Sequence, residues 1–109
     1  MIGALPEPIA EYFERSNSDD AAGRVADCFT EDAIVHDERQ HIRGRDAIRA
    51  WATEVRRKYR FHAEVSDVET IGDQTIVTAH LTGNFPGSPI DLRYRFKLAG
   101  PEIASLEIG

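Results

Sequence analysis

Cysteine is almost absent from this sequence, because Cys28 is the only one among 109 residues. A single thiol excludes an internal disulfide and any metal site built from several cysteines. Cys28 falls on the apolar side of an expected helix, beside Val25 and Phe29, which favours a buried, inert thiol over a nucleophile. The four histidines are scattered, with no H-x-x-H spacing. We therefore expect no metal and no other cofactor.

Long apolar runs are also missing. Charge-free stretches such as residues 75–88 are far shorter than the roughly 20 apolar residues of a membrane helix. The start of the chain has neither the basic segment nor the long apolar segment of a secretory signal. We therefore expect a cytoplasmic protein with no membrane contact.

Positive charge is scarce, since 13 Lys and Arg face 19 Asp and Glu, for a net charge of -6. The only dense basic run is formed by Arg56, Arg57, Lys58 and Arg60. This balance disfavours nucleic-acid binding. The run is interpreted as the solvated end of a helix in preference to a docking site for an acidic partner. The hydrophobic share of 41% is typical of a globular protein, and the length suits a single domain over residues 1–109.

Apolar spacing predicts three helices. Ile9, Tyr12 and Phe13 mark a short helix that ends near Asn17. Residues 18–20 offer a cap to a second short helix, whose apolar set is Ala22, Val25, Ala26 and Phe29. The longest helix begins at residues 44–46 and carries one apolar stripe, formed by Ile48, Trp51, Ala52, Val55 and Tyr59.

Alternation predicts five strands. Residues 33–37 form a short strand that leads into a loop at 38–41, and its alternation places Ala33, Val35 and Asp37 on one face. Residues 61–71, 74–85, 90–98 and 102–108 read as four antiparallel strands joined by hairpins. Together the elements predict an α+β fold, in which a cone-shaped, curved antiparallel or mixed sheet wraps around the long helix, with two short N-terminal helices.

Three segments carry a resemblance to a known family: FTEDAIVHD at 29–37, IRGRDAIRAW at 42–51 and YRF at 94–96. With the order of elements, they resemble the nuclear transport factor 2-like superfamily, specifically its SnoaL-like members. The resemblance implies a cystatin-like α+β barrel with a hydrophobic pocket for a small apolar molecule, and a homodimer formed through the convex sheet face. The superfamily includes ketosteroid isomerases, polyketide cyclases and non-catalytic pockets, so the fold leaves the reaction open.

The resemblance to the isomerases implies two catalytic residues. Asp37 matches the aspartate that removes the substrate proton, and Tyr12 matches the tyrosine that donates a hydrogen bond to the enolate oxygen. The isomerases also carry a second, protonated acid, which has no match in this sequence. Leu92 falls at its position, and Asp91 turns to the opposite face unless a bulge shifts it. Desolvation should raise the pKa of Asp37. The alternative role for Asp37 is to cap the following loop, and the alternative role for Tyr12 is to pack the helix against the sheet.

In a cone fold the packed core and the pocket wall are one surface, so the same apolar residues can be buried and contact a ligand. The residues expected to contact it are Phe13, Val35, Trp51, Val55, Tyr59, Phe85, Tyr94 and Phe96. The four histidines His36, His41, His62 and His80 are expected at solvent or at an interface.

Three functions stay open on the sequence alone. The first is a cofactor-independent isomerase, cyclase or lyase with Asp37 as base. The second is a binding module with no turnover, and the third is a structural homodimer whose cavity is filled by its own side chains. A cavity well below roughly 300 Å³ would favour the third.

Overall fold

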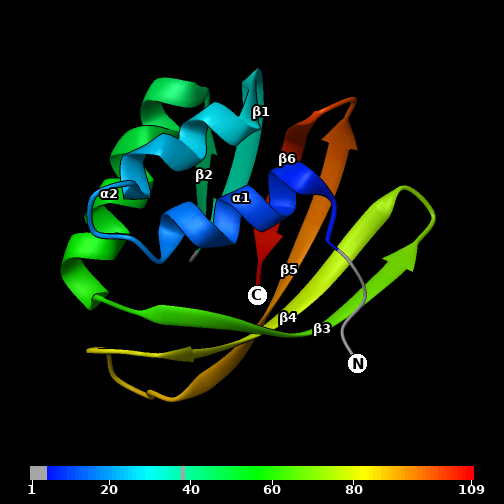
Figure 1. Cartoon of the computed structure of the whole chain (residues 1–109). Coiled ribbons are helices and arrows are strands. Elements are labelled where there is room, and N and C mark those ends of the chain that lie inside the picture. Colours follow the sequence, from blue (N-terminus) through cyan, green and yellow to red (C-terminus); the bar gives the residue numbers. More distant parts are fainter. Residues whose placement is uncertain (1–4, 38) are drawn as a thin grey trace.

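The computed structural model describes residues 5–37 and 39–109 (Figure 1). The helices are α1 (Glu7–Ser16), the 3₁₀ helix η1 (Ala22–Cys28) and α2 (Arg45–Tyr59). The strands are β1 (Phe29–Asp37), β2 (Gln40–Arg43), β3 (His62–Ile71), β4 (Gln74–Thr82), β5 (Ile90–Ala99) and β6 (Glu102–Ile108). These strands form one sheet in the order β2-β1-β6-β5-β4-β3.

The sheet is mixed and curved. Strands β3, β4, β5 and β6 follow one another as antiparallel neighbours, and β6 then pairs in parallel with β1. The register shifts between Val65 and Asp67 and between Lys97 and Leu98, and such irregularities bend a strand and increase its twist. In Figure 1 the three helices lie together on one side, over the concave face. The predicted α+β class is confirmed.

The apolar stripes seen in the sequence hold the helices on the sheet. In α1 the buried residues include Ile9, Tyr12 and Phe13, and Pro8 stands in the first turn, where its missing N–H costs no hydrogen bond. In α2, Ile48 and Ala52 are buried. The exposed fractions of Ile9 and Ile48 are both 0%, so each helix has an anchor in the core.

The second helix differs from the prediction because η1 is a 3₁₀ helix that ends before Phe29. It has seven residues and no side-chain cap, which disfavours a stable α-helix. Gly23 also lies very close to α2, since a Cβ there would be 3.0 Å from Oγ1 of Thr53. Phe29 instead opens β1, where it pairs with Ile103 of β6.

Half of the expected loop after β1 is strand, because β2 begins at Gln40. Asp37 pairs with Gln40 and Val35 pairs with Ile42, so β1 and β2 form a tight antiparallel hairpin. Glu38, the first residue of the expected loop, lies outside the described residues. Burial explains the strand, because the exposed fraction of Ile42 is only 9% and this residue extends the core beyond β1.

Two polar side chains tie the helical layer to β3. Asn17, which follows α1, donates from Nδ2 to the carbonyl of Ala63 at 2.9 Å, and its Oδ1 accepts from the Ala63 N–H at 2.8 Å. Arg56 donates from Nη1 to the carbonyls of Ser16 and Phe61. The Arg56 side chain is only 13% exposed, so the expectation of a solvated 56–60 run is wrong at this residue.

Cys28 is buried, as expected, and burial raises the pKa of its thiol. Among the described residues, no helix is long and apolar enough to cross a membrane.

Candidate functional site

The concave side of the sheet encloses a cavity of about 530 Å³. It lies between α1, α2 and strands β4 to β6, and this volume is within the range of ordinary small-ligand sites. Most of the lining side chains are aromatic or aliphatic. They are Tyr12, Val25, Trp51, Ala52, Val55, Tyr59, Phe61, Leu81, Phe85, Pro86, Ile90, Leu92, Tyr94 and Ile108, joined by Ser16, Asp37 and Gly109.

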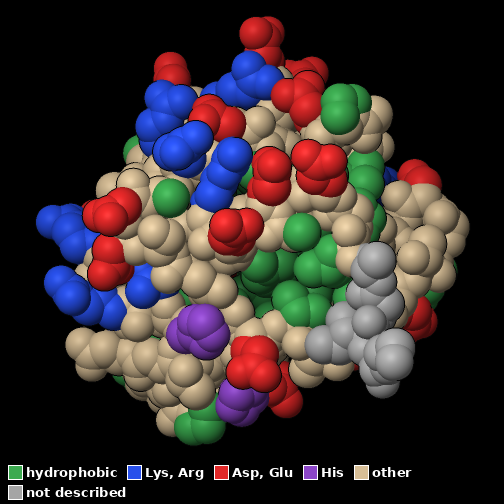
Figure 2. All heavy atoms as spheres, in the orientation of Figure 1, with side chains coloured by type: hydrophobic (Ala, Val, Ile, Leu, Met, Phe, Trp, Pro, Cys, Tyr) green, Lys and Arg blue, Asp and Glu red, His purple; other side chains and the backbone are tan. Residues whose placement is uncertain are grey.

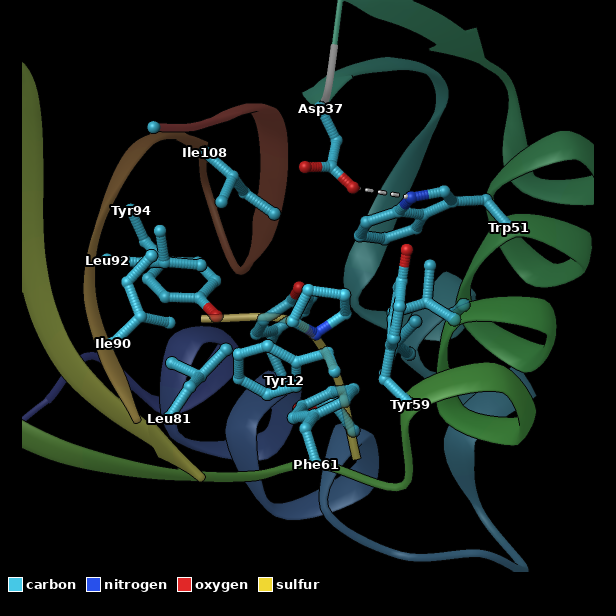
Figure 3. Close-up of a pocket in the computed structure, with 17 residues that line it drawn as sticks. Tyr12, Asp37, Trp51, Tyr59, Phe61, Leu81, Ile90, Leu92, Tyr94 and Ile108 are labelled. Atoms are coloured by element: carbon cyan, nitrogen blue, oxygen red, sulfur yellow. Dashed lines mark hydrogen bonds between the residues drawn. The ribbon is translucent and has the colours of Figure 1, made fainter. Parts of the chain in front are cut away.

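Asp37 provides the one charged side chain on the described part of this wall. It is the last residue of β1, and alternation along the strand puts it on the same face as Ala33 and Val35, which are buried. The indole Nε1 of Trp51 donates a hydrogen bond of 3.0 Å to Oδ2 of Asp37. Figure 3 shows the carboxylate and the indole facing each other above the apolar wall. The indole therefore fixes the orientation of the carboxylate.

Two buried phenols, Tyr12 of α1 and Tyr94 of β5, line the same cavity, with their ring centroids 6.3 Å apart. Burial raises the pKa of Tyr12, with further contributions from Tyr94 and Asp37. Burial and then the charge of Asp37 also raise the pKa of Tyr94. Both groups therefore stay protonated at physiological pH and can donate a hydrogen bond.

Their hydroxyl groups face open space in the cavity. Neither forms a hydrogen bond with another side chain or with the backbone within residues 5–37 and 39–109. Among the same residues, every fully buried side-chain nitrogen or oxygen has a hydrogen-bond partner. Because the two phenol oxygens have no such partner, they must be accessible from the cavity. In Figure 3 the Tyr94 hydroxyl points from β5 toward the middle of the pocket. The cavity thus combines one carboxylate with two neutral donors.

The second acid of the isomerases has no counterpart on this wall. Leu92 lines the cavity, whereas Asp91 lies on the outer face of the sheet. There Oδ1 of Asp91 is 2.8 Å from Nδ1 of His80, which is its partner across β4 and β5. The register between these two strands is regular at this point, so no bulge turns Asp91 inward.

Five of the eight side chains expected on the wall do line the cavity: Trp51, Val55, Tyr59, Phe85 and Tyr94. Phe13, Val35 and Phe96 lie instead in the packed core, with exposed fractions of 5%, 0% and 0%. The wall also contains apolar side chains that were not expected to contact a ligand, among them Phe61, Leu81, Ile90 and Ile108. Leu81 could have been found, because the alternation of β4 places it on the same face as the inward-facing Val77 and Ala79.

The histidines lie away from the cavity wall. The rings of His36 and His41 contact each other across the β1 and β2 hairpin, with centroids 4.3 Å apart. His62 and His80 are exposed. Within the described residues, no group of three His, Cys, Asp or Glu side chains is placed to hold a metal ion.

A curved mixed sheet that closes around an apolar cavity beneath three helices defines the nuclear transport factor 2-like, cystatin-like class of folds. Residues 9–100 match the SnoaL-like domain family, and the chain belongs to that family. The predicted family is therefore confirmed. No protein of curated function matches the chain.

Solved structures support the same assignment. A candidate polyketide cyclase from Sinorhizobium meliloti is 33% identical, with a TM-score of 0.88 over 96% of this chain and 95% of that one. A candidate SnoaL-like polyketide cyclase from Jannaschia sp. CCS1 is 21% identical, with a TM-score of 0.76 over 94% and 82%. A hypothetical protein with a ketosteroid isomerase-like fold from Catenulispora acidiphila, in complex with trimethylamine, is 18% identical, with a TM-score of 0.83 over 97% and 86%.

Proposed function

We propose that the cavity binds a small, largely apolar carbonyl compound and that Asp37 moves one of its protons, so that the protein is a cofactor-independent isomerase, cyclase or lyase. The observation that carries this proposal is the composition of the wall. One carboxylate, oriented by Trp51, shares an apolar cavity with the protonated phenols of Tyr12 and Tyr94.

The chemistry follows from these groups. The carboxylate of Asp37 takes a proton from the carbon next to the carbonyl, and the C–H electron pair moves into the carbonyl to give an enolate. Tyr12 and Tyr94 donate hydrogen bonds to the enolate oxygen, where the negative charge develops.

In an isomerase the proton then returns from Asp37 to a different carbon. In a cyclase the enolate carbon attacks a second carbonyl, whose π electrons move to its oxygen, and the resulting alkoxide takes the proton from Asp37. In a lyase the enolate expels a leaving group from the next carbon, and that group takes the proton. The resemblance to a candidate polyketide cyclase at 33% identity supports this class of reaction.

The test is hydrogen exchange into 2-tetralone, a small apolar ketone with acidic protons, incubated with the protein in deuterated buffer and followed by NMR. We expect the wild-type protein to accelerate deuterium incorporation. Asp37→Asn should lower the accelerated rate at least about 100-fold, which is the usual contribution of a general base. Asp91→Asn is the matched control, because it neutralises a carboxylate on the outer face of the sheet. Equal rates for the two variants would refute Asp37 as the base.

The second candidate is a binding module with no turnover, and Leu92 is the observation that favours it. An apolar residue stands where the isomerases carry their second acid, so the enolate has only the two phenols to stabilise it. In the same experiment, saturable shifts of the ketone resonances without deuterium incorporation would support binding alone.

We also propose that two copies associate through the convex face of β3 to β6. Exposed side chains of both charge signs cover this face, among them His80, Asp91, Arg93 and Arg95. Sedimentation velocity should show a dimer that Arg95→Glu weakens. A monomer at all concentrations would exclude it.

A further inference from the structure

Arginine side chains line a second hollow on the outside of the molecule, between the start of η1 and α2. Its volume is about 550 Å³, and no residue lines both this hollow and the cavity. Its basic residues are Arg24, Arg49, Arg56, Arg57 and Arg60, and we refer to it as the arginine groove. In Figure 2, Lys and Arg side chains gather at the upper left, where Figure 1 places η1 and α2.

The spacing along α2 explains how the groove forms. Arg49 and Arg56 stand at positions i and i+7, which a helix of 3.6 residues per turn brings onto one side of α2. Arg60 follows as the residue that caps the end of the helix. Arg24 faces it from η1, where Gly23 has no side chain to block the close approach of the two helices.

The lining of the groove has a positive formal charge in a chain that is negative as a whole, and acids beside it pair with Arg49 and Arg57. It contains five of the eleven arginines and neither lysine, while the net charge of the chain is -6. The acids on its wall are Asp19 and Asp20, so the formal charge of the lining is +3. Asp19 is already engaged by Arg56, whose Nε lies 2.9 Å from Oδ1 of Asp19.

Within the described residues, two of these arginines, Arg24 and Arg60, form no ion pair, and both side chains are exposed. The nearby carboxylate of Asp19 has its pKa lowered first by Arg56 and then by the charge of Arg60. Arg60 also has a φ of 44°, a left-handed conformation that glycine or asparagine usually occupies at a helix end. The chain therefore carries arginine at a position where the backbone conformation favours glycine or asparagine, and other arginines line the same groove.

We propose that the arginine groove binds a small polyanion that carries two or more phosphate groups, at a site separate from the cavity. The planar guanidinium group donates paired hydrogen bonds that match phosphate oxygens. The volume is in the range of small-ligand sites, which favours a small molecule over a long polymer. Arg24 and Arg60, which form no ion pair within the described residues, can each contact a phosphate of one ligand.

The experiment measures binding of inorganic pyrophosphate to the full chain by calorimetry, at constant ionic strength. We expect saturable binding, and we expect the double variant Arg24→Gln/Arg60→Gln to weaken it at least about tenfold, since each substitution removes charge-assisted hydrogen bonds. The charge-matched control is Arg39→Gln/Arg43→Gln, which removes two exposed arginines from the hairpin of β1 and β2. This control should bind pyrophosphate like the wild type.

Two outcomes would overturn the proposal. Equal weakening in both double variants would show a general response to net charge, and a lack of saturable binding by the wild type would show that the groove holds no such anion. Thermal unfolding of each variant shows whether it is folded, and neither Arg24 nor Arg60 makes a contact whose loss should unfold the protein. If Arg60→Gln disturbs the helix end, Arg24→Gln alone still tests the site.

Discussion

The indole Nε1 of Trp51 donates a hydrogen bond of 3.0 Å to Oδ2 of Asp37. This contact joins α2 to the last residue of β1 at the edge of the cavity (Figure 3). Trp51 is the only tryptophan in the sequence, so tryptophan fluorescence reports on the indole that contacts Asp37.

The first prediction concerns that reporter. Titration with acid should change the Trp51 emission in one transition as Asp37 gains a proton, and Asp37→Asn should abolish the transition. Desolvation favours the protonated acid, whereas the indole donor favours the carboxylate. A midpoint above about 3.9 would support the raised pKa expected from the sequence. If the transition persists in Asp37→Asn, the hydrogen bond is not present in solution.

The second prediction concerns alkaline stability. Burial raises the pKa of Tyr12 and of Tyr94 above the value of about 10 that holds in the unfolded chain. Below pH 10 both states keep these protons, so stability is unaffected. Above it the unfolded state loses them first, and the free energy of unfolding falls by about 1.4 kcal/mol per pH unit for each tyrosine.

Tyr94→Phe and Tyr12→Phe each remove one ionising group. Each variant should therefore lose stability less steeply above pH 10, by about 1.4 kcal/mol per pH unit. Urea unfolding of each variant between pH 9 and pH 11 measures this slope, and the same titration at pH 7, where no tyrosine ionises, gives the direct effect of the lost hydroxyl. A slope identical to that of the wild type would mean that the phenol is solvated in the folded protein.

The third prediction concerns Asn17. Asn17→Ala leaves the N–H and the carbonyl of Ala63 without their side-chain partner, and Ala63 is only 4% exposed. We expect a loss of about 2–3 kcal/mol in the free energy of unfolding, because buried backbone groups are left unpaired. Ser18→Ala, at the next position, should change it by less than about 0.5 kcal/mol. Similar values for the two variants would show that water replaces the amide.

The fourth prediction concerns Gly83, which follows β4. A Cβ at this position would lie 2.8 Å from Cα of Phe61 and 3.0 Å from the carbonyl oxygen of Tyr59. Gly83→Ala must therefore displace backbone that carries two wall residues, at a cost of about 1–3 kcal/mol. NMR shifts of Tyr59 and Phe61 should move with it. Asn84→Ala, on an exposed neighbour, should leave both unchanged.

The sequence predicted the parts of the fold that depend on local pattern. The α2 stripe and the four hairpin-connected strands follow from apolar spacing and turn residues, and β6 occupies the predicted residues. It did not predict β2 or the 3₁₀ geometry of η1, because both depend on contacts between segments distant in sequence. Ile42 needs the core beneath it, and Gly23 needs α2 beside it.

The same limit applies to the site. Alternation identifies which side chains of a strand face inward, and this places Asp37, Leu92 and Tyr94 on the correct side. It does not determine how far along the cone the packed core ends and the cavity begins, which depends on the curvature of the sheet. Phe96 is two residues beyond Tyr94 on the same face, yet it lies wholly in the core.

The parallel pairing of β1 with β6 has a consequence for folding kinetics. It brings together Phe29 and Ile103, which are 74 positions apart, whereas α2 and the β3 and β4 hairpin form from neighbouring segments. Closing so long a loop costs chain entropy before any contact repays it, and such topologies fold over milliseconds to seconds. We therefore expect local elements to form early and the middle of the sheet to be the slow step, with β1 exposed as an unpaired edge until then.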